Sequence, residues 1–290
     1  MNYRKKLMVK PGSRIKLADL DPGYKGRHES HDEARPEILK HVQKMDELQY
    51  LMYAEKQHAL LIVLQGLDAG GKDGVVRHVI SGMNPAGCKV AGFKGPTSEE
   101  LAHDFLWRVH PHAPAKGEVA IFNRSHYEDV LVARVHALVP KPVWAPRYQL
   151  INDFEKLLAV ENNTTILKFF LYISQDEQLA RFKERLETPA KNWKISDADY
   201  KERGHWDEYI AAFEDMLRKT STRHAPWFVI PANHKWFRDL AISSIIVETM
   251  QAMKMRPPEP TVDLDEIRQL YHAAADEESE RSRPKPKKHR

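Results

Sequence analysis

The chain has 290 residues, of which 42% are hydrophobic and 30% charged, which is the composition of a folded protein with one large domain or two small ones. Its formal net charge of +4 is too near balance to indicate a nucleic-acid-binding protein. The lone cysteine, Cys88, cannot form an internal disulfide and fits a reducing compartment. No apolar run resembles a signal peptide or approaches the ~20 residues that span a bilayer. We therefore expect a cytoplasmic protein with neither a membrane nor a nucleic-acid partner.

The N-terminal part of the chain divides into a polar arm and a helix. Residues 1–32 are rich in Lys, Gly, Asp and His and are interpreted as an extended arm that packs over the surface. Between residues 33 and 57 the apolar residues recur in steps of three and four, which predicts an amphipathic helix. These apolar positions are Ile38, Val42, Met45, Leu48, Leu51 and Met52.

The next segment has the pattern of a phosphate-binding loop. The apolar run 59–64 predicts a buried strand, and the residues from Gly74 onward predict a helix. Between them, Gly66 and Gly71 are five residues apart, and Lys72 follows the second glycine. In this spacing, backbone N–H groups and the positive helix N-terminus gather around an anion. The alternative is a glycine-rich turn without a ligand, but the strand before and the helix after favour a phosphate site.

Two carboxylates accompany this loop. Asp73 stands where a Ser or Thr hydroxyl usually reaches Mg²⁺, and Asp68 lies within the loop. Two carboxylates would repel a phosphate unless a divalent cation lay between them. The loop therefore predicts Mg²⁺, with Mn²⁺ as the alternative, and Asp68 and Asp73 as its ligands.

Four further apolar runs predict the rest of a sheet. Because they alternate with helical stretches, we expect an α/β fold with a parallel sheet covered by helices on both faces. Ligands of such sheets bind beyond the carboxyl ends of the strands, so functional residues should directly follow them. The runs are 89–93, 119–122, 166–173 and 227–230.

A second motif follows the third predicted strand. Asn123 ends this strand, and Arg124 comes next, where a guanidinium can bind phosphate oxygens with two hydrogen bonds. Glu128 and Asp129 come about one helical turn later and are candidates for binding metal or nucleotide. The alternative is a helix N-terminus that Ser125 caps and in which the acidic residues face the dipole. Both interpretations are compatible.

The stretch 182–219 is long, mostly helical and heavily charged, and it lies between two predicted strands. We interpret it as a lid over the phosphate site; the alternative is a solvated pair of helices. Five cations in or beside it suit a highly charged phosphate donor or acceptor: Arg181, Arg185, Lys191, Lys194 and Arg203.

The C-terminal part, residues 257–290, begins with prolines and predicts a helix at 263–275, followed by a charged, low-complexity tail. The 15 histidines lack the cysteine cluster or HExxH motif of a zinc site, so they are interpreted as structural.

Three motifs in this order resemble the polyphosphate kinase 2 family: residues 66–74, 122–128 and 189–194. The resemblance extends from roughly residue 30 to 255, and the kinase domain that it implies is residues 33–256, with the lid at about 182–219. It implies a P-loop kinase fold with a helical lid. It also implies Mg²⁺-dependent phosphoryl transfer between inorganic polyphosphate and purine nucleotides, from AMP to ADP and from ADP to ATP. The residues around 125–129 look like the subgroup that acts on both AMP and ADP, and we expect a dimer or tetramer.

The resemblance also implies roles for individual residues. Asp68, Lys72, Asp73 and Arg124 match the family's catalytic residues, and its lid arginine matches Arg181 or Arg185. Asn123 departs from members that have Asp at that place. The positions assigned to nucleotide or phosphate binding are Gly66, Ala69, Gly70, Gly71, Gly74, Asn123, Glu128 and Asp129. Two alternatives remain: an ATP-dependent kinase of the same fold, and a non-catalytic phosphate-binding protein.

Overall fold

The computed structural model describes residues 2–282 and divides the chain into two units, Met1–Arg256 and Pro257–Arg290. The second unit contains helix α12 (Leu264–Ser282), which overlaps the helix predicted at 263–275 and extends beyond its predicted end. Residues 283–290, most of the predicted charged tail, lie outside the described residues. Over the described residues, no helix is both long and apolar enough to cross a membrane.

A five-stranded sheet forms the centre of the first unit, with the strand order β2-β3-β1-β4-β5. Every pair of neighbours is parallel, which confirms the predicted α/β fold. Central strands of such sheets are covered on both faces, so their sequences are continuously apolar. The strands are β1 (Ala59–Gly66), β2 (Cys88–Gly92), β3 (Val119–Asn123), β4 (Thr164–Tyr172) and β5 (Trp227–Pro231).

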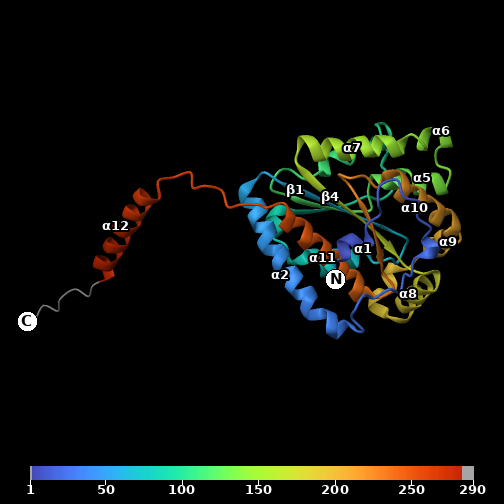
Figure 1. Ribbon diagram of the computed structural model, residues 1–290, viewed down its shortest axis with the longest axis horizontal. Helices are drawn as coiled ribbons and strands as arrows, with labels where there is room; N and C mark the ends of the chain where they lie inside the picture. Colours follow the sequence, from blue (N-terminus) through green and yellow to red (C-terminus); the bar gives the residue numbers. More distant parts are fainter. Residues whose placement is uncertain (1, 283–290) are drawn as a thin grey trace, which may run out of the picture. The chain divides into compact units, whose positions relative to one another are not determined.

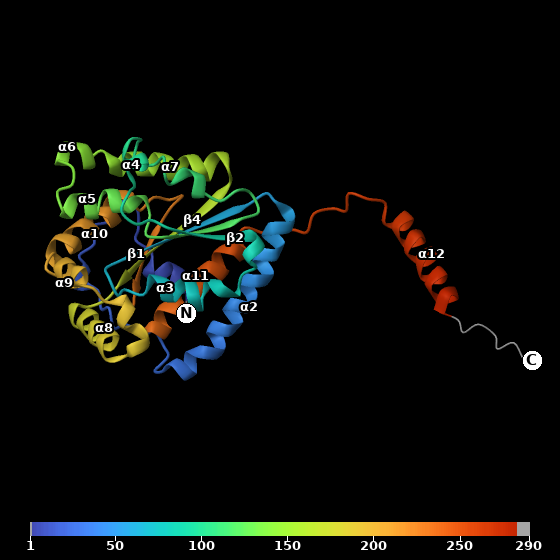
Figure 2. The same ribbon diagram turned by 180° about the vertical axis from the view of Figure 1, so that it is seen from behind.

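Helices cover both faces of the sheet (Figures 1 and 2). Side chains of β1 alternate between two hydrophobic cores: Leu60 and Ile62 belong to one, and Leu61 and Val63 to the other. Helices on the first face are α1 (Tyr3–Leu7), α2 (His31–Glu55), α3 (Lys72–His78) and α11 (Lys235–Ala252); on the second are α5 (Val132–Val135), α7 (Arg147–Glu161) and α10 (Trp206–Thr220). Short elements join them: η2 (Ile80–Gly82), η3 (Pro85–Gly87), α4 (Ser98–Leu101), η4 (His110–His112), η5 (His126–Asp129) and α6 (Lys141–Trp144).

The N-terminal residues pack against the domain. This segment, predicted as an extended arm, contains the five-residue helix α1 and the short turn η1 (Leu17–Asp19). Tyr3, Val9 and Leu17 are buried, and the Val9 N–H donates to the Trp227 carbonyl at 2.8 Å. The segment therefore contributes to both cores.

The strand order brings the two sequence motifs together. Leu64 of β1 pairs with Asn123 of β3, so the loop after β1 and the turn after β3 leave the sheet side by side. The Arg124 N–H donates to the Leu64 carbonyl at 3.1 Å. Chain connections also diverge here, to β2 and β3 on one side and to β4 and β5 on the other, which is where open α/β sheets bind ligands.

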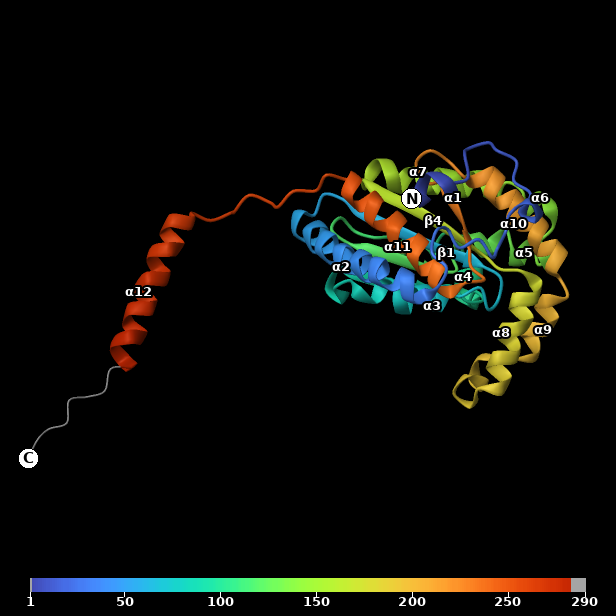
Figure 3. The same ribbon diagram turned by 60° about the horizontal axis from the view of Figure 1, so that its bottom comes forward.

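A charged excursion leaves the domain after β4. It consists of α8 (Gln175–Glu187), the turn η6 (Pro189–Lys194) and α9 (Asp197–Arg203), and Figure 3 shows α8 and α9 projecting from the sheet. Helix α10, although within the predicted lid range, packs into the second core through Phe213, Met216 and Leu217. The part that projects therefore ends before α10.

A buried polar network supports the turn after β3. Lys168 and Glu155 are completely buried, and their side chains pair at 2.6 Å. Lys168 Nζ also donates to the Tyr127 hydroxyl at 2.8 Å and to the Thr220 carbonyl at 2.7 Å. Burial lowers the pKa of Lys168 to about 8. The network connects β4, α7, η5 and the end of α10. It leaves no unpaired charge in the core, because Lys168 and Glu155 neutralise each other.

Helix α8 begins at a specific hydrogen-bonding residue, which leads to a first prediction. Ser174 Oγ accepts from the Glu177 N–H at 3.1 Å and from Asn233 Nδ2 at 3.2 Å. Ser174→Ala should therefore lower the free energy of unfolding by about 1 kcal/mol and the melting temperature by roughly 2–4 °C. Ser174→Asp, another N-cap residue, should retain most of the stability. Calorimetry measures both, and equal melting temperatures for wild type and Ser174→Ala would contradict the role of this cap.

Candidate active site

In the loop after β1, neighbouring atoms lie very close to two glycines, as is typical of a phosphate-binding loop. Gly71 precedes α3 and has φ 101°, a left-handed conformation that favours glycine. A Cβ on Gly71 would lie 2.1 Å from Arg238 Nη1, and a Cβ on Gly66 would lie 2.8 Å from the Leu171 carbonyl oxygen. Ala69 also has a positive φ, 61°. The loop therefore leaves no room for side chains at its two predicted glycines.

Lys72, the first residue of α3, is folded back onto this loop. Its Nζ donates to the Gly66 carbonyl at 2.7 Å and to the Leu67 carbonyl at 3.3 Å. Burial and the neighbouring positive charge of Arg124 lower the pKa of Lys72 to about 8. A phosphate bound in the loop would favour the charged ammonium.

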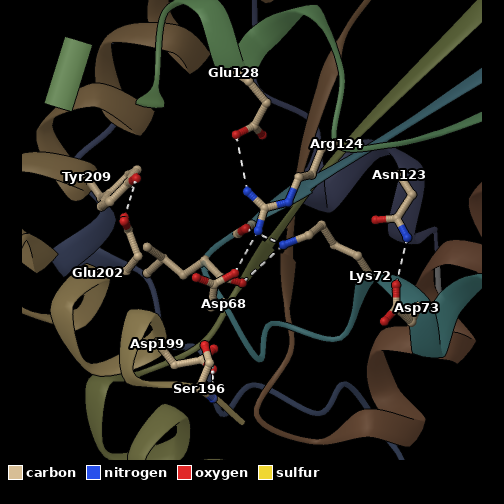
Figure 4. A network of polar contacts seen from close by, with 12 residues as sticks. Asp68, Lys72, Asp73, Asn123, Arg124, Glu128, Ser196, Asp199, Glu202 and Tyr209 are labelled. Carbon is tan, nitrogen blue, oxygen red and sulfur yellow. Dashed lines mark hydrogen bonds and ion pairs between the residues drawn. The ribbon is translucent and has the colours of Figure 1, made fainter. Parts of the chain in front are cut away.

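Arg124 connects the two motifs (Figure 4). Its backbone is left-handed, with φ 64°, which is unusual for a residue with a long side chain. Its Nη2 donates to Asp68 Oδ1 at 2.8 Å, and its Nη1 donates to Glu128 Oε2 at 3.3 Å. The guanidinium is thus held between a carboxylate of the phosphate loop and one of η5.

Asp73 lies apart from that ion pair and accepts a hydrogen bond from Asn123 Nδ2 at 2.7 Å. The described residues contain no group of three or more His, Cys, Asp or Glu side chains that could hold a metal ion. The donor chemistry nevertheless fits a divalent cation, since Mg²⁺ is commonly held by one or two carboxylates together with substrate phosphates. Asp68 and Asp73 line the same cavity, so they are the residues that would supply those carboxylates.

Two cavities meet at these residues. The first has a volume of about 780 Å³ and is lined by the phosphate loop and many cations. The second, of about 680 Å³, is lined by aromatic and acidic side chains together with five cations, Lys94, Arg124, Arg185, Lys194 and Arg203. Asp68, Asp73 and Arg124 line both. The first cavity also contains Ala69, Gly70, Gly71, Lys72, Gly74 and Asn123; the second contains Gly66, Glu128, Trp193, Glu202, Trp206, Tyr209 and Phe213.

The predicted lid cations take different positions. Arg185 and Lys194 line both cavities, Lys191 lines the first, and Arg203 lines the second. Several of them are paired with neighbouring residues. Lys191 and Lys235 both donate hydrogen bonds to Glu184, and these hydrogen bonds lower the pKa of Glu184 to about 2. Arg185 Nη1 donates to the Lys194 carbonyl at 3.0 Å, and Arg203 Nη1 donates to the Gln175 carbonyl at 2.8 Å.

Arg181 differs from the other lid cations because it is buried. Its Nη1 donates to the Ala69 carbonyl at 2.7 Å, and its Nη2 donates to the carbonyls of Ala232 and Asn233. Burial lowers its pKa. Arg181 therefore joins the phosphate loop to the segment after β5, even though it also borders the first cavity.

The structure does not bring Asp129 to this site. Asp129 lines neither of the two cavities described above, and it pairs with Arg147 Nη1 at 3.0 Å. Burial raises the pKa of the Asp129 carboxyl, and Arg147 opposes that rise. Its position shows why an acidic pair in sequence need not act together: Glu128 faces Arg124, whereas Asp129 faces α7.

Sequence reasoning missed several cations of the site, of which Lys94 and Arg238 are two. Lys94 lines both cavities and closely follows β2, so the rule that functional residues follow parallel strands would have found it. Arg238 lines the first cavity from α11. No local pattern marks it, because it approaches the phosphate loop from about 170 residues further along the chain.

Three features together define a phosphoryl-transferring enzyme of the P-loop kinase class. They are a glycine-rich loop at the end of the central parallel strand, a lysine at the start of the following helix and an arginine after the neighbouring strand. The model of the family described as Polyphosphate kinase 2 matches residues 27–258. The chain belongs to this family.

Relatives and a solved structure agree with this assignment. The AMP/ADP-polyphosphate phosphotransferase of Meiothermus ruber is 50% identical over 264 residues, which are 91% of this chain and 98% of the relative. The ADP-polyphosphate phosphotransferase of Rhodopseudomonas palustris is 43% identical, over 89% of this chain and 93% of the relative. The crystal structure of polyphosphate kinase 2 from Arthrobacter aurescens TC1 is similar with a TM-score of 0.90 and 38% identity, covering 94% of this chain and 97% of that one.

The lowered pKa of Lys72 predicts a particular pH dependence. The ammonium that attracts phosphate is present below about pH 8 in the free enzyme and is lost as the pH rises through that value. We expect kcat/KM to fall above about pH 8, because it reports the free enzyme. At saturation kcat should fall only at higher pH, since bound phosphate raises the pKa.

Initial rates of phosphoryl transfer between pH 6 and 10 measure both profiles. Lys72→Arg is the control, because a guanidinium keeps its charge throughout this range. A fall in kcat/KM near pH 8 that persists in Lys72→Arg would contradict the assignment to Lys72.

Proposed function

We propose that this protein transfers phosphoryl groups reversibly between inorganic polyphosphate and nucleotides, making ADP from AMP and ATP from ADP with polyphosphate as donor. The observation that carries the proposal is the pair of cavities that share Asp68, Asp73 and Arg124. A phosphoryl transfer between two substrates needs such a shared centre, because the attacking and leaving oxygens lie on opposite sides of the transferred group. The relative that is named for AMP and ADP supports both acceptors.

The first cavity suits polyphosphate. Its cations come from the phosphate loop, from the lid and from α11, as Lys72, Lys191 and Lys235 illustrate. Polyphosphate carries a negative charge on each phosphoryl group and has no base to stack, so a cavity lined by cations matches its chemistry.

The second cavity suits a nucleotide. Trp193 and Trp206 offer aromatic surface to a purine. The Tyr209 hydroxyl donates to Glu202 Oε2 at 2.7 Å, which leaves Glu202 fixed as an acceptor for ribose hydroxyls or a base amine. Burial and the nearby Glu202 raise the pKa of Tyr209, so its hydroxyl stays a donor.

The chain's own residues act by positioning and charge. Lys72 and Arg124 place positive charge beside the transferred phosphoryl group, where it stabilises the transition state. Asp68 forms an ion pair with the guanidinium of Arg124 and thereby fixes its orientation. An attacking phosphate oxygen is already anionic, so no strong general base is needed. We propose Mg²⁺, or Mn²⁺, as the divalent cation. Asp68 and Asp73 would hold it, and its chemistry would be to neutralise charge on the phosphate oxygens.

One assay tests the proposed function against its two rivals. Purified protein is incubated with polyphosphate, Mg²⁺ and AMP, ADP, GMP or GDP, and the products are separated by chromatography. We expect ADP and ATP from the adenine nucleotides. Turnover of ATP with AMP but not of polyphosphate would identify an ATP-dependent kinase, and binding without turnover would identify a phosphate-binding protein.

We also propose that the enzyme is cytoplasmic and forms a homo-oligomer. A cytoplasmic location is supported by the lone Cys88 and by the nucleotide substrates, and localisation of a tagged protein tests it. A homo-oligomer, dimer or tetramer, stays a prediction that light scattering would test.

A further inference from the structure

Arg238 is buried beside the phosphate loop but is not fully paired. It lies in the first turns of α11 and is 2% exposed. Its Nε and Nη2 both contact Asp239 Oδ1 at 2.8 Å. Within the described part of the chain, Nη1 has no hydrogen-bond acceptor. Arg238 lines the first cavity, so Nη1 is left available to donate to a ligand bound there.

The guanidinium of Arg238 also packs against the start of α3. A Cβ on Gly71 would lie 2.1 Å from Nη1, and a Cβ on Gly74 would lie 2.9 Å from Nη2. The glycines therefore make room for Arg238 and not only for phosphate.

Two further buried cations surround the same helix end. Lys72 begins α3, and Arg181 Nη1 would be 3.7 Å from a Cβ on Gly71. Lys72 donates to two carbonyls and Arg181 to three, so both are largely satisfied within the protein. Arg238 has a single carboxylate partner, and burial raises the pKa of Asp239, which Arg238 opposes. Of the three buried cations Lys72, Arg181 and Arg238, Arg238 is thus the one with a hydrogen-bond donor left for an anion in the first cavity.

We infer that Arg238 binds a non-bridging oxygen of polyphosphate through Nη1, and that Asp239 is the positioning residue that orients its guanidinium. This inference rests on the proposed function. Arg238 lines the first cavity and, of the two cavities described here, not the second, so the contact is with the polyphosphate and not with the nucleotide.

Steady-state kinetics of Arg238→Gln test the inference. Losing a hydrogen bond to a charged group costs ~1.5–3 kcal/mol, so we expect the KM for polyphosphate of defined length to rise roughly 10- to 100-fold. The KM for ADP should stay within about twofold. The KM for polyphosphate should also become less dependent on salt than in wild type, because one screened phosphate contact is missing.

A second variant separates binding from support of the loop. Arg238→Lys keeps the charge but loses the two-pronged contact with Asp239; it should fold as wild type does and still raise the KM for polyphosphate. Binding of inorganic tripolyphosphate, measured by calorimetry without nucleotide, should weaken in both variants. Arg35→Gln is the matched control, since Arg35 is exposed on α2 outside both cavities, and its constants should equal those of wild type.

The outcomes distinguish the inference from the proposed function. Arg238 variants with the wild-type KM for polyphosphate, or with equal increases in both KM values, would overturn the inference and assign Arg238 to loop support. A wild-type enzyme that does not use polyphosphate at all would instead overturn the proposed function.

Discussion

Arg124→Ala should lower kcat by ~10²–10³ with saturating polyphosphate and ADP, because a single well-placed charge contact to the transition state has about that effect. The side chain is held in place by Asp68 and Glu128, so its charge is already oriented before substrate binds. Phosphoryl transfer depends on such orientation more than on covalent chemistry. Rapid-quench or steady-state assays at saturating substrate measure the loss.

Two further variants make this result specific. Arg124→Lys should also be impaired, since an ammonium cannot bridge two carboxylates as a guanidinium fork does. Lys183→Ala should keep the wild-type kcat, because Lys183 is an exposed cation of α8 that lines neither cavity. The melting temperature of Arg124→Ala shows whether the domain stays folded. A folded Arg124→Ala enzyme with kcat within threefold of wild type would remove Arg124 from the catalytic centre.

Removal of the divalent cation should abolish turnover, and Asp73→Asn should lower kcat by ~10²–10³. An amide has the shape of the carboxylate and can still accept from Asn123 Nδ2, the present partner of Asp73. The loss would therefore report the missing charge and not a disturbed loop. The apparent Mg²⁺ affinity, from rates across a titration of the metal, should fall as well.

Asp68→Asn provides the comparison. Asp68 pairs with Arg124 at 2.8 Å, so its substitution should disturb both the cation site and the direction of the guanidinium. Asp73→Asn should shift the metal dependence without altering the effect of Arg124→Ala, whereas Asp68→Asn should be non-additive with Arg124→Ala. Wild-type metal affinity and kcat in Asp73→Asn would exclude Asp73 as a metal ligand.

Much of the fold is predictable because its determinants are local. Each strand is a short apolar run next to turn residues, and alternation with helices requires parallel crossovers. The phosphate loop is predictable for the same reason: Gly66, Gly71 and Lys72 act through the backbone conformation of a few consecutive residues. Register then follows from the sheet, which places Asn123 beside Leu64 and hence Arg124 beside the loop.

The roles of cations distant in sequence were not predictable from pattern. Arg181 and Arg185 are one helical turn apart and look equivalent in the sequence, but Arg181 is buried against the carbonyls of Ala69 and Ala232, whereas Arg185 borders both cavities. The spacing of two cations in the sequence does not show which of them will donate hydrogen bonds to backbone carbonyls after folding and which will face a cavity. Glu128 and Asp129 differ in the same way.

The sequence by itself determined the parallel sheet, the phosphate loop and the position of Arg124 after β3, because backbone geometry and hydrophobic periodicity act over neighbouring residues. The tertiary structure decided which side chains complete the site. Arg238 reaches Gly71 from α11, Lys94 reaches both cavities from the end of β2, and α10 joins the core instead of the projecting lid. These outcomes depend on packing between segments far apart in the chain, and packing is set by the whole fold and not by any local run of residues.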